Sequence, residues 1–204
     1  KNIFKEETLP WETYIPKNAD KIILGTYPTI INNRDFDFFY PNKNNKFWNV
    51  LAKIANLKLA DFNHDKAGKE LAVKERKQVL DKLKLALSDM GYKVLRQNNS
   101  SLDSNLFPVE FIDIFQIIKD NPKIKTIILT SSSKGNSALS WFKTYCIING
   151  IDLPSKKKKN KLPMEFEIFV ENKRLKVAIV YSTSGLAAKP VEFLVEQYSK
   201  IINS

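Results

Sequence analysis

Three short apolar runs constrain the fold more than any other feature of this sequence. They are KIILG at residues 21–25, TIILT at 126–130 and KVAIVY at 176–181. None alternates polar and apolar residues, which is typical of strands buried on both faces of a parallel sheet. The stretches between them carry apolar side chains at helical spacing, so strands alternate with helices. We therefore predict an α/β fold, a three-layer α/β/α sandwich around a mostly parallel sheet of roughly four strands.

Proline and turn residues set the expected boundaries of the other elements. The predicted helices lie at residues 47–54, 66–87, 108–119 and 136–149, with a last helix after Pro190. Pro108 and Pro190 suit a first helical turn, whose N–H groups have no partner within the helix. Before the last strand, residues 165–170 and 175–180 flank a turn-like segment at 171–174, which predicts a short antiparallel hairpin. At 204 residues, the chain is expected to form a single domain over 1–204.

Charge points to a polyanionic partner. The net charge is +11 and the isoelectric point about 9.5, which favours salt-dependent attraction to nucleic acid. The alternative is a general bias toward Lys, Asn and Ile without a dedicated binding face. Apolar runs of about five or six residues are too short to span a bilayer, and the single cysteine, Cys146, allows no internal disulfide or cysteine metal site. We expect a soluble, cytoplasmic monomer without metal or cofactor, and Cys146 as a buried apolar residue.

Candidate site residues follow the apolar runs. In doubly wound sheets, ligands bind where the carboxyl ends of parallel strands meet their loops. The segments selected by this rule are residues 25–29, 88–89, 131–136 and 182–188. Many α/β proteins end their strands in small polar residues, so this placement alone names no chemistry.

Two motifs near opposite ends of the chain resemble a known family. Gly25-Thr-Tyr-Pro-Thr29, followed by Phe39-Tyr-Pro-Asn-Lys-Asn-Asn-Lys-Phe-Trp48, resembles the first motif of the uracil-DNA glycosylase superfamily. Ser182-Thr-Ser-Gly-Leu-Ala187 is similar to the second motif of its mismatch-specific (thymine/uracil) branch. Its Ser-Thr-Ser portion and Ser101-Leu-Asp-Ser104 look more like the hypoxanthine-type branch. The resemblance implies an enzyme that flips a base out of DNA and hydrolyses its N-glycosidic bond.

The resemblance and the placement of the loops together suggest how DNA would be held. Tyr40 matches the aromatic that stacks on the extruded base, and Leu186 matches the residue that enters the vacated space in the duplex. The alternatives are a core aromatic at Tyr40 and an ordinary apolar residue at Leu186. The expected base-binding residues are Thr26, Tyr27, Tyr40, Ser133 and Asn136, and the expected DNA-binding residues are Ser182, Thr183, Ser184, Gly185, Leu186 and Lys189. The lysines at 156–159 and Lys161 form either a phosphate-contacting loop or a solvated one.

Catalysis is assigned to Asn45 and Asp89. Many superfamily members have Asp or Asn where this chain has Tyr27, and an ordinary tyrosine is a poor base at neutral pH. The resemblance to the hypoxanthine-type branch makes Asn45 the catalytic candidate, orienting water through its amide oxygen. Its alternative is to cap the following helix. Asp89 either contacts the base, serves as an auxiliary base or ends a turn, and Asp103 either joins the site or caps a helix.

Two functions are favoured by the sequence, beside a third, an unrelated small-molecule α/β enzyme that would not bind DNA at low salt. The first is a monofunctional, metal-independent DNA glycosylase that acts on uracil or hypoxanthine. The second is a catalytically silent nucleic-acid-binding member of the same fold. Tyr27 in place of an acid and Ser182 in place of the usual histidine or asparagine motivate the second. The single histidine, His64, lies in a polar stretch and is expected at the surface.

Overall fold

The central sheet of this protein has five strands, and its order is β3-β2-β6-β8-β7. The computed structural model describes residues 1–155, 161–185 and 188–204. The strands are β2 (Lys21–Gly25), β3 (Leu85–Asp89), β6 (Thr126–Leu129), β7 (Met164–Val170) and β8 (Lys173–Ile179). Four of them are parallel, and β7 joins the edge as the antiparallel partner of β8. The α/β prediction is confirmed, but the sheet is mixed and five-stranded because the expected hairpin is part of it.

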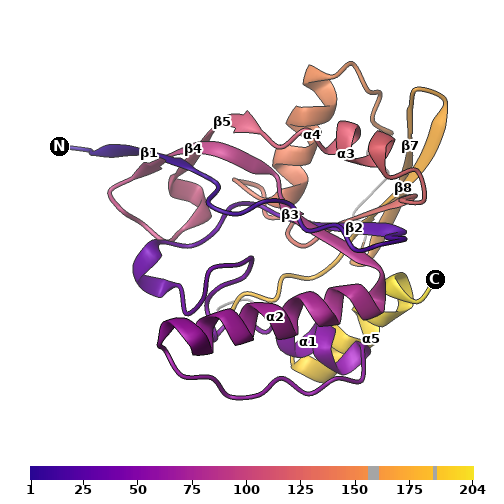
Figure 1. Cartoon of the computed structure of the whole chain (residues 1–204). Helices are drawn as coiled ribbons and strands as arrows, with labels where there is room; N and C mark the ends of the chain where they lie inside the picture. The colour runs from indigo at the N-terminus through magenta and orange to yellow at the C-terminus, as the bar shows by residue number, and fades with distance from the viewer. Residues whose placement is uncertain (156–160, 186–187) are drawn as a thin grey trace.

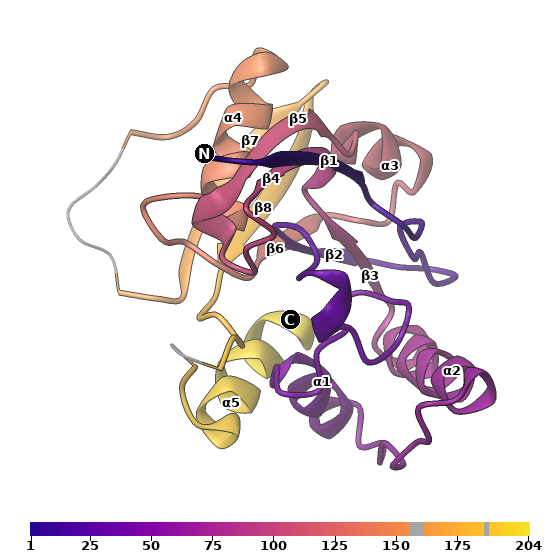
Figure 2. The same cartoon turned by 90° about the vertical axis from the view of Figure 1, so that its left-hand side faces the viewer.

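Helices cover both faces of this sheet. They are α1 (Phe47–Ile54), α2 (Lys66–Leu83), α3 (Ile114–Asp120), α4 (Ala138–Ile148) and α5 (Val191–Ile202). Figures 1 and 2 show α1, α2 and α5 together on one side of the sheet and α3 and α4 on the other. No helix within the described ranges is long and apolar enough to cross a lipid bilayer.

A second sheet was not predicted. It contains β1 (Phe4–Thr8), β4 (Gly91–Gln97) and β5 (Leu106–Phe111), antiparallel in the order β1-β4-β5. β1 and β4 show neither a continuous apolar run nor a strict alternation, and the apolar start of β5 contains Pro108. Large apolar side chains such as Phe4 and Phe107 remain exposed. The pattern that identifies buried strands is therefore missing from this part of the sequence.

The helix expected at residues 108–119 begins later than predicted. Pro108 lies in β5, an edge strand, where a residue without an N–H is tolerated. The helix α3 starts at Ile114, and the side chain of Asp113 accepts a hydrogen bond from the backbone N–H of Gln116. An aspartate cap, rather than the proline, sets the start of this helix.

The helix expected at 66–87 is too long in the prediction. It ends at Leu83, and Lys84 adopts a left-handed backbone with φ of 53°. The following residues form β3, which is buried along its whole length. Leu87, which continues the helical spacing of Leu80 and Leu83, therefore lies in a strand. A left-handed lysine gives little signal in a sequence, since this conformation is usually taken by glycine or asparagine.

The register of the central sheet brings the polar loops to one edge. Gly25 at the end of β2 pairs with Asp89 at the end of β3. The neighbouring β6 ends at Leu129 and β8 at Ile179, both running in the same direction. Short 3-10 turns at Ile31–Asn33 (η1) and Asp103–Asn105 (η2) flank this edge from the loops. The carboxyl ends of four parallel strands thus open toward a common space.

Candidate functional site

A cavity of about 520 Å³ lies at this edge of the sheet. Every segment that the strand-end rule selects contributes to its wall. The lining residues are Thr26, Tyr27, Pro28, Thr29, Asn33, Tyr40, Pro41, Asn42, Asn44, Asn45, Asp89, Ser101, Leu102, Asp103, Thr130, Ser131, Ser182, Thr183, Ser184 and Gly185. The segments that carry the family resemblance therefore surround one space, although they are far apart in the sequence.

Gly25 forms the closest-packed part of the floor. A Cβ atom at this position would lie 2.5 Å from Oδ1 of Asp89 and 2.7 Å from the hydroxyl oxygen of Tyr40. Real Cβ atoms are essentially never this close to other heavy atoms. The glycine thus allows the carboxyl of Asp89 and the phenol of Tyr40 to approach the backbone of β2 from two different loops.

Tyr40 is held on two sides. Its ring stacks on Phe47 with centroids 3.8 Å apart and an angle of 11° between the planes. Its hydroxyl lies 2.6 Å from the hydroxyl of Thr130, and its backbone is left-handed with φ of 49°. Burial is the main cause that raises the pKa of this phenol well above its ordinary value, so it stays protonated. The ring is therefore packed against the core and is also part of the cavity wall.

The orientation of Asn45 is fixed by two hydrogen bonds. Its Oδ1 accepts from the backbone N–H of Phe47 at 2.9 Å and from the hydroxyl of Thr183 at 2.7 Å. Because a backbone N–H can only donate, the atom facing it must be the amide oxygen. Among the described residues, Nδ2 of Asn45 has no hydrogen-bond partner. Asn45 therefore offers its amide donor to the cavity, while its oxygen binds the first turn of α1 and the loop after β8.

Two carboxyl groups share the cavity. Asp89 is 5% exposed; burial is the main cause that raises its pKa to about 8, the charge of Asp103 raises it further, and Arg34 opposes the rise. Burial also raises the pKa of Asp103 to about 6, against a hydrogen bond with Thr26 and the charge of Arg96. Near pH 7, Asp89 therefore keeps its proton and Asp103 is ionised. One group can donate a hydrogen bond to a ligand, and the other can accept one or take a proton.

The turn η2 carries Asp103 and is fixed from outside the cavity. Nδ2 of Asn136 donates to the backbone oxygen of Asp103 at 2.8 Å and to that of Leu106 at 2.5 Å. Its Oδ1 accepts from the indole N–H of Trp141 at 3.0 Å. Asn136 was expected to bind the base, but its amide is engaged with protein groups and it does not line the cavity. Asn136 instead holds the η2 turn, which carries the carboxyl of Asp103.

Arg96 links the second sheet to the cavity wall. Its side chain is 1% exposed, and its Nε donates to Oε2 of Glu7 at 2.6 Å. Its terminal nitrogens donate to the backbone oxygens of Ser100 at 2.8 Å and Pro28 at 2.7 Å. Arg96 thereby joins β1, the loop before η2 and the Gly-x-x-Pro turn. No sequence motif pointed to this residue, because its partners lie in segments that become neighbours only when the second sheet forms.

Tyr27 and Thr26 occupy the turn after β2. The hydroxyl of Tyr27 is buried without a hydrogen-bond partner among the described residues, and burial is the main cause that raises its pKa. It stays neutral, so the structure gives it no role as a base. The hydroxyl of Thr26 lies 3.5 Å from that of Ser131 and interacts with Asp103.

The loop after β8 follows the rim of the cavity. Thr183 is 1% exposed, and its backbone oxygen accepts from the N–H of Lys46 at 3.1 Å. Ser184 and Gly185 are exposed, and the N–H of Ser184 bonds to the hydroxyl of Ser182 at 3.1 Å. A rim with small exposed residues leaves room for a large ligand to reach the interior.

Several predicted residues are not brought into the cavity. Ser133 is exposed and its hydroxyl donates to the backbone oxygen of Asn136 at 3.3 Å. Lys189 is exposed, and its ammonium lies 5.3 Å from the ring centroid of Tyr181. His64, which was expected at the surface and not in the site, is exposed beside Asp35. Leu186 and the lysines at 156–159 lie outside the described residues.

Two residues that directly follow β6 line the cavity but were not among the expected base-binding residues. Ser131 is the first residue of the selected segment 131–136, and Thr130 lies one residue before it. Their position provided the signal, because the first residues after a parallel strand lie nearest the floor of such a site.

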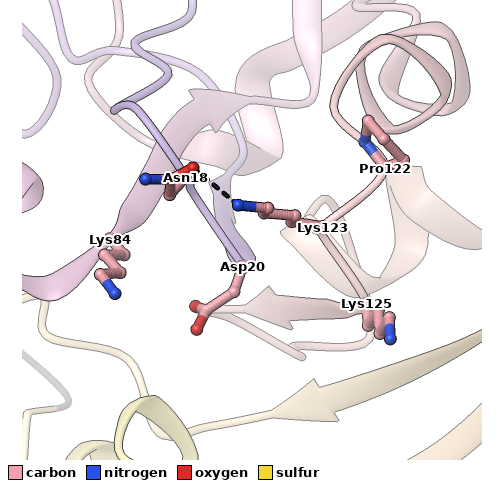
Figure 3. Close-up of a pocket in the computed structure, with 6 residues that line it drawn as sticks. All are labelled: Asn18, Asp20, Lys84, Pro122, Lys123 and Lys125. Carbon is pink, nitrogen blue, oxygen red and sulfur yellow. Dashed lines mark hydrogen bonds between the residues drawn. The ribbon is translucent and has the colours of Figure 1, made fainter.

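A second opening of about 560 Å³ lies near the amino ends of β2 and β6. Its lining residues are Asn18, Asp20, Lys84, Pro122, Lys123 and Lys125 (Figure 3). The ammonium of Lys123 donates to the side-chain oxygen of Asn18 at 2.8 Å, as the dashed line in Figure 3 shows. This opening has lysines and one carboxylate but none of the motif residues. We therefore assign the candidate site to the opposite edge of the sheet.

Comparison with known proteins supports the fold. No family model matches the chain, and no curated protein matches it. A similar solved structure is the solution NMR structure of a protein from Methanosarcina acetivorans, described as a "putative Uracil DNA glycosylase". The TM-score is 0.55 at 15% sequence identity, and the match covers 93% of this chain and 94% of that one. At this identity the likeness shows the fold, which extends over nearly the whole chain.

Proposed function

We propose that this protein is a monofunctional DNA glycosylase that extrudes a deaminated base, uracil or hypoxanthine, and hydrolyses its N-glycosidic bond. The observation that carries this proposal is the single cavity that gathers Tyr40, Asn45, Asp89 and the loop at 182–185. These segments carry the resemblance to the uracil-DNA glycosylase superfamily, and the fold is shared with a structure described by a related name. The net charge of +11 supports DNA as the partner.

The cavity supports binding of an extruded base. Extrusion costs a few kcal/mol of stacking and pairing, which contacts in the pocket must replace. Tyr40 offers an aromatic wall supported from behind by Phe47. The protonated carboxyl of Asp89 can donate through one oxygen and accept through the other. A donor and an acceptor side by side on Asp89 complement the adjacent C=O and N–H groups of uracil and hypoxanthine. The same carboxyl can also pair with a base that presents an amino group beside a ring nitrogen.

Contacts outside the base pocket fit the proposal as well. The exposed backbone at Ser184 and Gly185, with the hydroxyl of Ser182, is suited to a phosphate beside the lesion. The Nδ2 of Asn45 can donate to an oxygen of the base or sugar as negative charge leaves with the base. No lysine lines the cavity among the described residues, which agrees with a mechanism without a Schiff base.

A lesion panel tests this function. Oligonucleotides with a single uracil, hypoxanthine or xanthine, and matched undamaged strands, would be incubated with the protein and then treated with alkali. We expect alkali-labile sites with at least one deaminated base and none with undamaged strands. Intact strands for every lesion after prolonged incubation would overturn the proposal.

The second candidate function is a nucleic-acid-binding protein without catalysis. Two observations favour it over a catalytic role: Tyr27 is neutral, and the amide oxygen of Asn45 is engaged with protein donors. It predicts salt-sensitive binding to duplex DNA without preference for lesions and without product. The same lesion panel, combined with binding at two salt concentrations, separates the two candidates.

A further inference from the structure

Hydrolysis in this cavity would be assisted by a group that accepts a hydrogen bond from the attacking water and can then take its proton. Asn45 was expected to orient water through its amide oxygen. Both lone pairs of that oxygen are already used, by the N–H of Phe47 and the hydroxyl of Thr183. The remaining Nδ2 donates hydrogen bonds, which would reduce rather than increase the nucleophilicity of a water molecule.

The other polar groups that line the cavity limit which side chain could accept the proton from water. Asp89 and Asp103 are the two carboxyl groups among the described lining residues, which include no histidine, lysine or glutamate. Asp89 is buried on the floor, where its Oδ1 lies against the backbone of Gly25. Asp103 lies in a different element, the turn η2 between β4 and β5, and is only partly buried. The two carboxyls therefore occupy different walls.

We propose that Asp103 is a catalytic residue that holds the attacking water and accepts its proton. This inference rests on the proposed glycosylase function. The η2 turn is fixed by Asn136, because Nδ2 of Asn136 donates to the backbone oxygens of Asp103 and Leu106.

The reaction balances with this assignment. The bond between C1′ and the base nitrogen breaks, and its electron pair leaves on the base. The water oxygen bonds to C1′, and one water proton passes to the carboxylate of Asp103. The base anion takes a proton from solvent and Asp103 returns its proton to solvent. The negative charge of Asp103 also stabilises the positive sugar that forms as the base departs.

Charged and titratable groups around Asp103 come from three other segments. They are Asp89 from β3, Arg96 from β4 and Tyr40 from the loop before α1. Tyr40 and Asp89 hold their protons at neutral pH, and Arg96 carries a positive charge that favours the ionised carboxylate. The ionised form of Asp103 is thus available above about pH 6.

Single-turnover rates on an oligonucleotide with uracil or hypoxanthine test the assignment between pH 5 and 8. We expect the wild-type rate to fall below about pH 6. The Asp103→Asn variant should be at least about 100-fold slower at pH 7.5 and lack this acid limb. The Asp103→Glu variant should react at least about tenfold faster than Asp103→Asn, and its rate should again fall at acidic pH. Asp61→Asn removes an exposed carboxylate outside the cavity and should match the wild type.

Binding and stability measurements separate chemistry from structure. The Asn variant should bind a duplex with a tetrahydrofuran abasic analogue within about twofold of the wild type and melt at a similar temperature. Two results would overturn the assignment of Asp103 and leave the proposed function standing. One is an Asp103→Asn rate within about threefold of the wild type, and the other is a wild-type rate that does not change between pH 5 and 8. A wild-type protein inactive on every lesion would instead overturn the proposed function.

Discussion

The hydroxyl of Thr183 donates to Oδ1 of Asn45 at 2.7 Å, across 138 residues of sequence. The backbone oxygen of Thr183 also accepts from the N–H of Lys46, so the loop after β8 binds the start of α1 through two atoms of one residue. The two motifs that resemble the glycosylase superfamily are thus joined directly. Thr183 is 1% exposed, which means that this junction is buried beneath the rim of the cavity.

Replacement of Thr183 by valine should weaken this junction without changing its volume. The hydroxyl bond is lost while the bond from Phe47 to Asn45 remains, so we expect a loss of about 1 kcal/mol in the free energy of unfolding. Glycosylase activity should fall about tenfold because the amide of Asn45 is less firmly oriented. Urea unfolding and single-turnover rates measure the two effects. Thr144→Val, on the exposed face of α4, is the matched control; equal behaviour of both variants would contradict this prediction.

Alanine at Gly25 should disable the site. The new methyl group would press on Asp89 and on the phenol of Tyr40, which cannot retreat because it stacks on Phe47. We expect an overpacking cost of about 1–3 kcal/mol and a loss of activity larger than the loss of stability explains. Gly135→Ala is the control, since nothing lies within 4 Å of its Cβ position. Full activity of the Gly25 variant would show that the floor relaxes more than the packing suggests.

The carboxyl of Asp89 should make stability depend on pH. Burial raises its pKa from 3.8 to about 8 in the folded protein, so between these values the folded state holds a proton that the unfolded state has lost. Stability therefore falls as pH rises, by up to about 1.4 kcal/mol per pH unit. The window from pH 6.5 to 7.5 isolates Asp89, because Asp103 titrates near 6.

The Asp89→Asn variant measures this contribution, since an amide of the same shape does not titrate. Urea unfolding at pH 6.5 and 7.5 should give a smaller decrease in stability for the variant than for the wild type. Parallel slopes for the two proteins would mean that Asp89 is already ionised in the folded state. In that case the carboxyl could not donate a hydrogen bond to a base.

The pair formed by Arg96 and Glu7 should behave as a unit. Removal of Arg96 alone, as Arg96→Met, leaves the partly buried Glu7 with only the longer ion pair to Arg34 at 3.9 Å and should cost about 3–5 kcal/mol. The double variant with Glu7→Gln should be more stable than the sum of the single changes predicts. A double-mutant cycle by urea unfolding gives the coupling. Additive losses would indicate that the bonds from Arg96 to the backbone of Pro28 and Ser100 dominate.

The parts of the fold that could be predicted are those with a strong local pattern. The strand KIILG at 21–25 is buried on both faces, and its apolar run contains no alternation. The strand-end rule then located the cavity wall, including Asp89, without knowledge of the sheet order. Local patterns are sufficient here because a buried parallel strand has few alternatives in sequence.

The missing parts depend on contacts between distant segments. The bond from Arg96 to Glu7 spans 89 residues and exists only because β1 pairs with β4. Asp103 could equally have capped a helix, because Ser and Asp serve both purposes. The direction of the amide of Asn45 depends on Thr183, a residue near the other end of the chain. Side-chain orientation of this kind is set by tertiary structure and leaves no local pattern.

Asp89 and Asp103 belong to elements that differ in how deeply they are buried. Asp89 ends a strand sealed in the middle layer, whereas Asp103 sits in a connection between strands of a partly solvated sheet. Connections of this type accept insertions and substitutions that a sealed strand does not. Over evolutionary time, the η2 wall could be rebuilt while the floor stays unchanged. Directed evolution toward new bases would accordingly gain most by randomising the β4–β5 connection around a fixed Asp103.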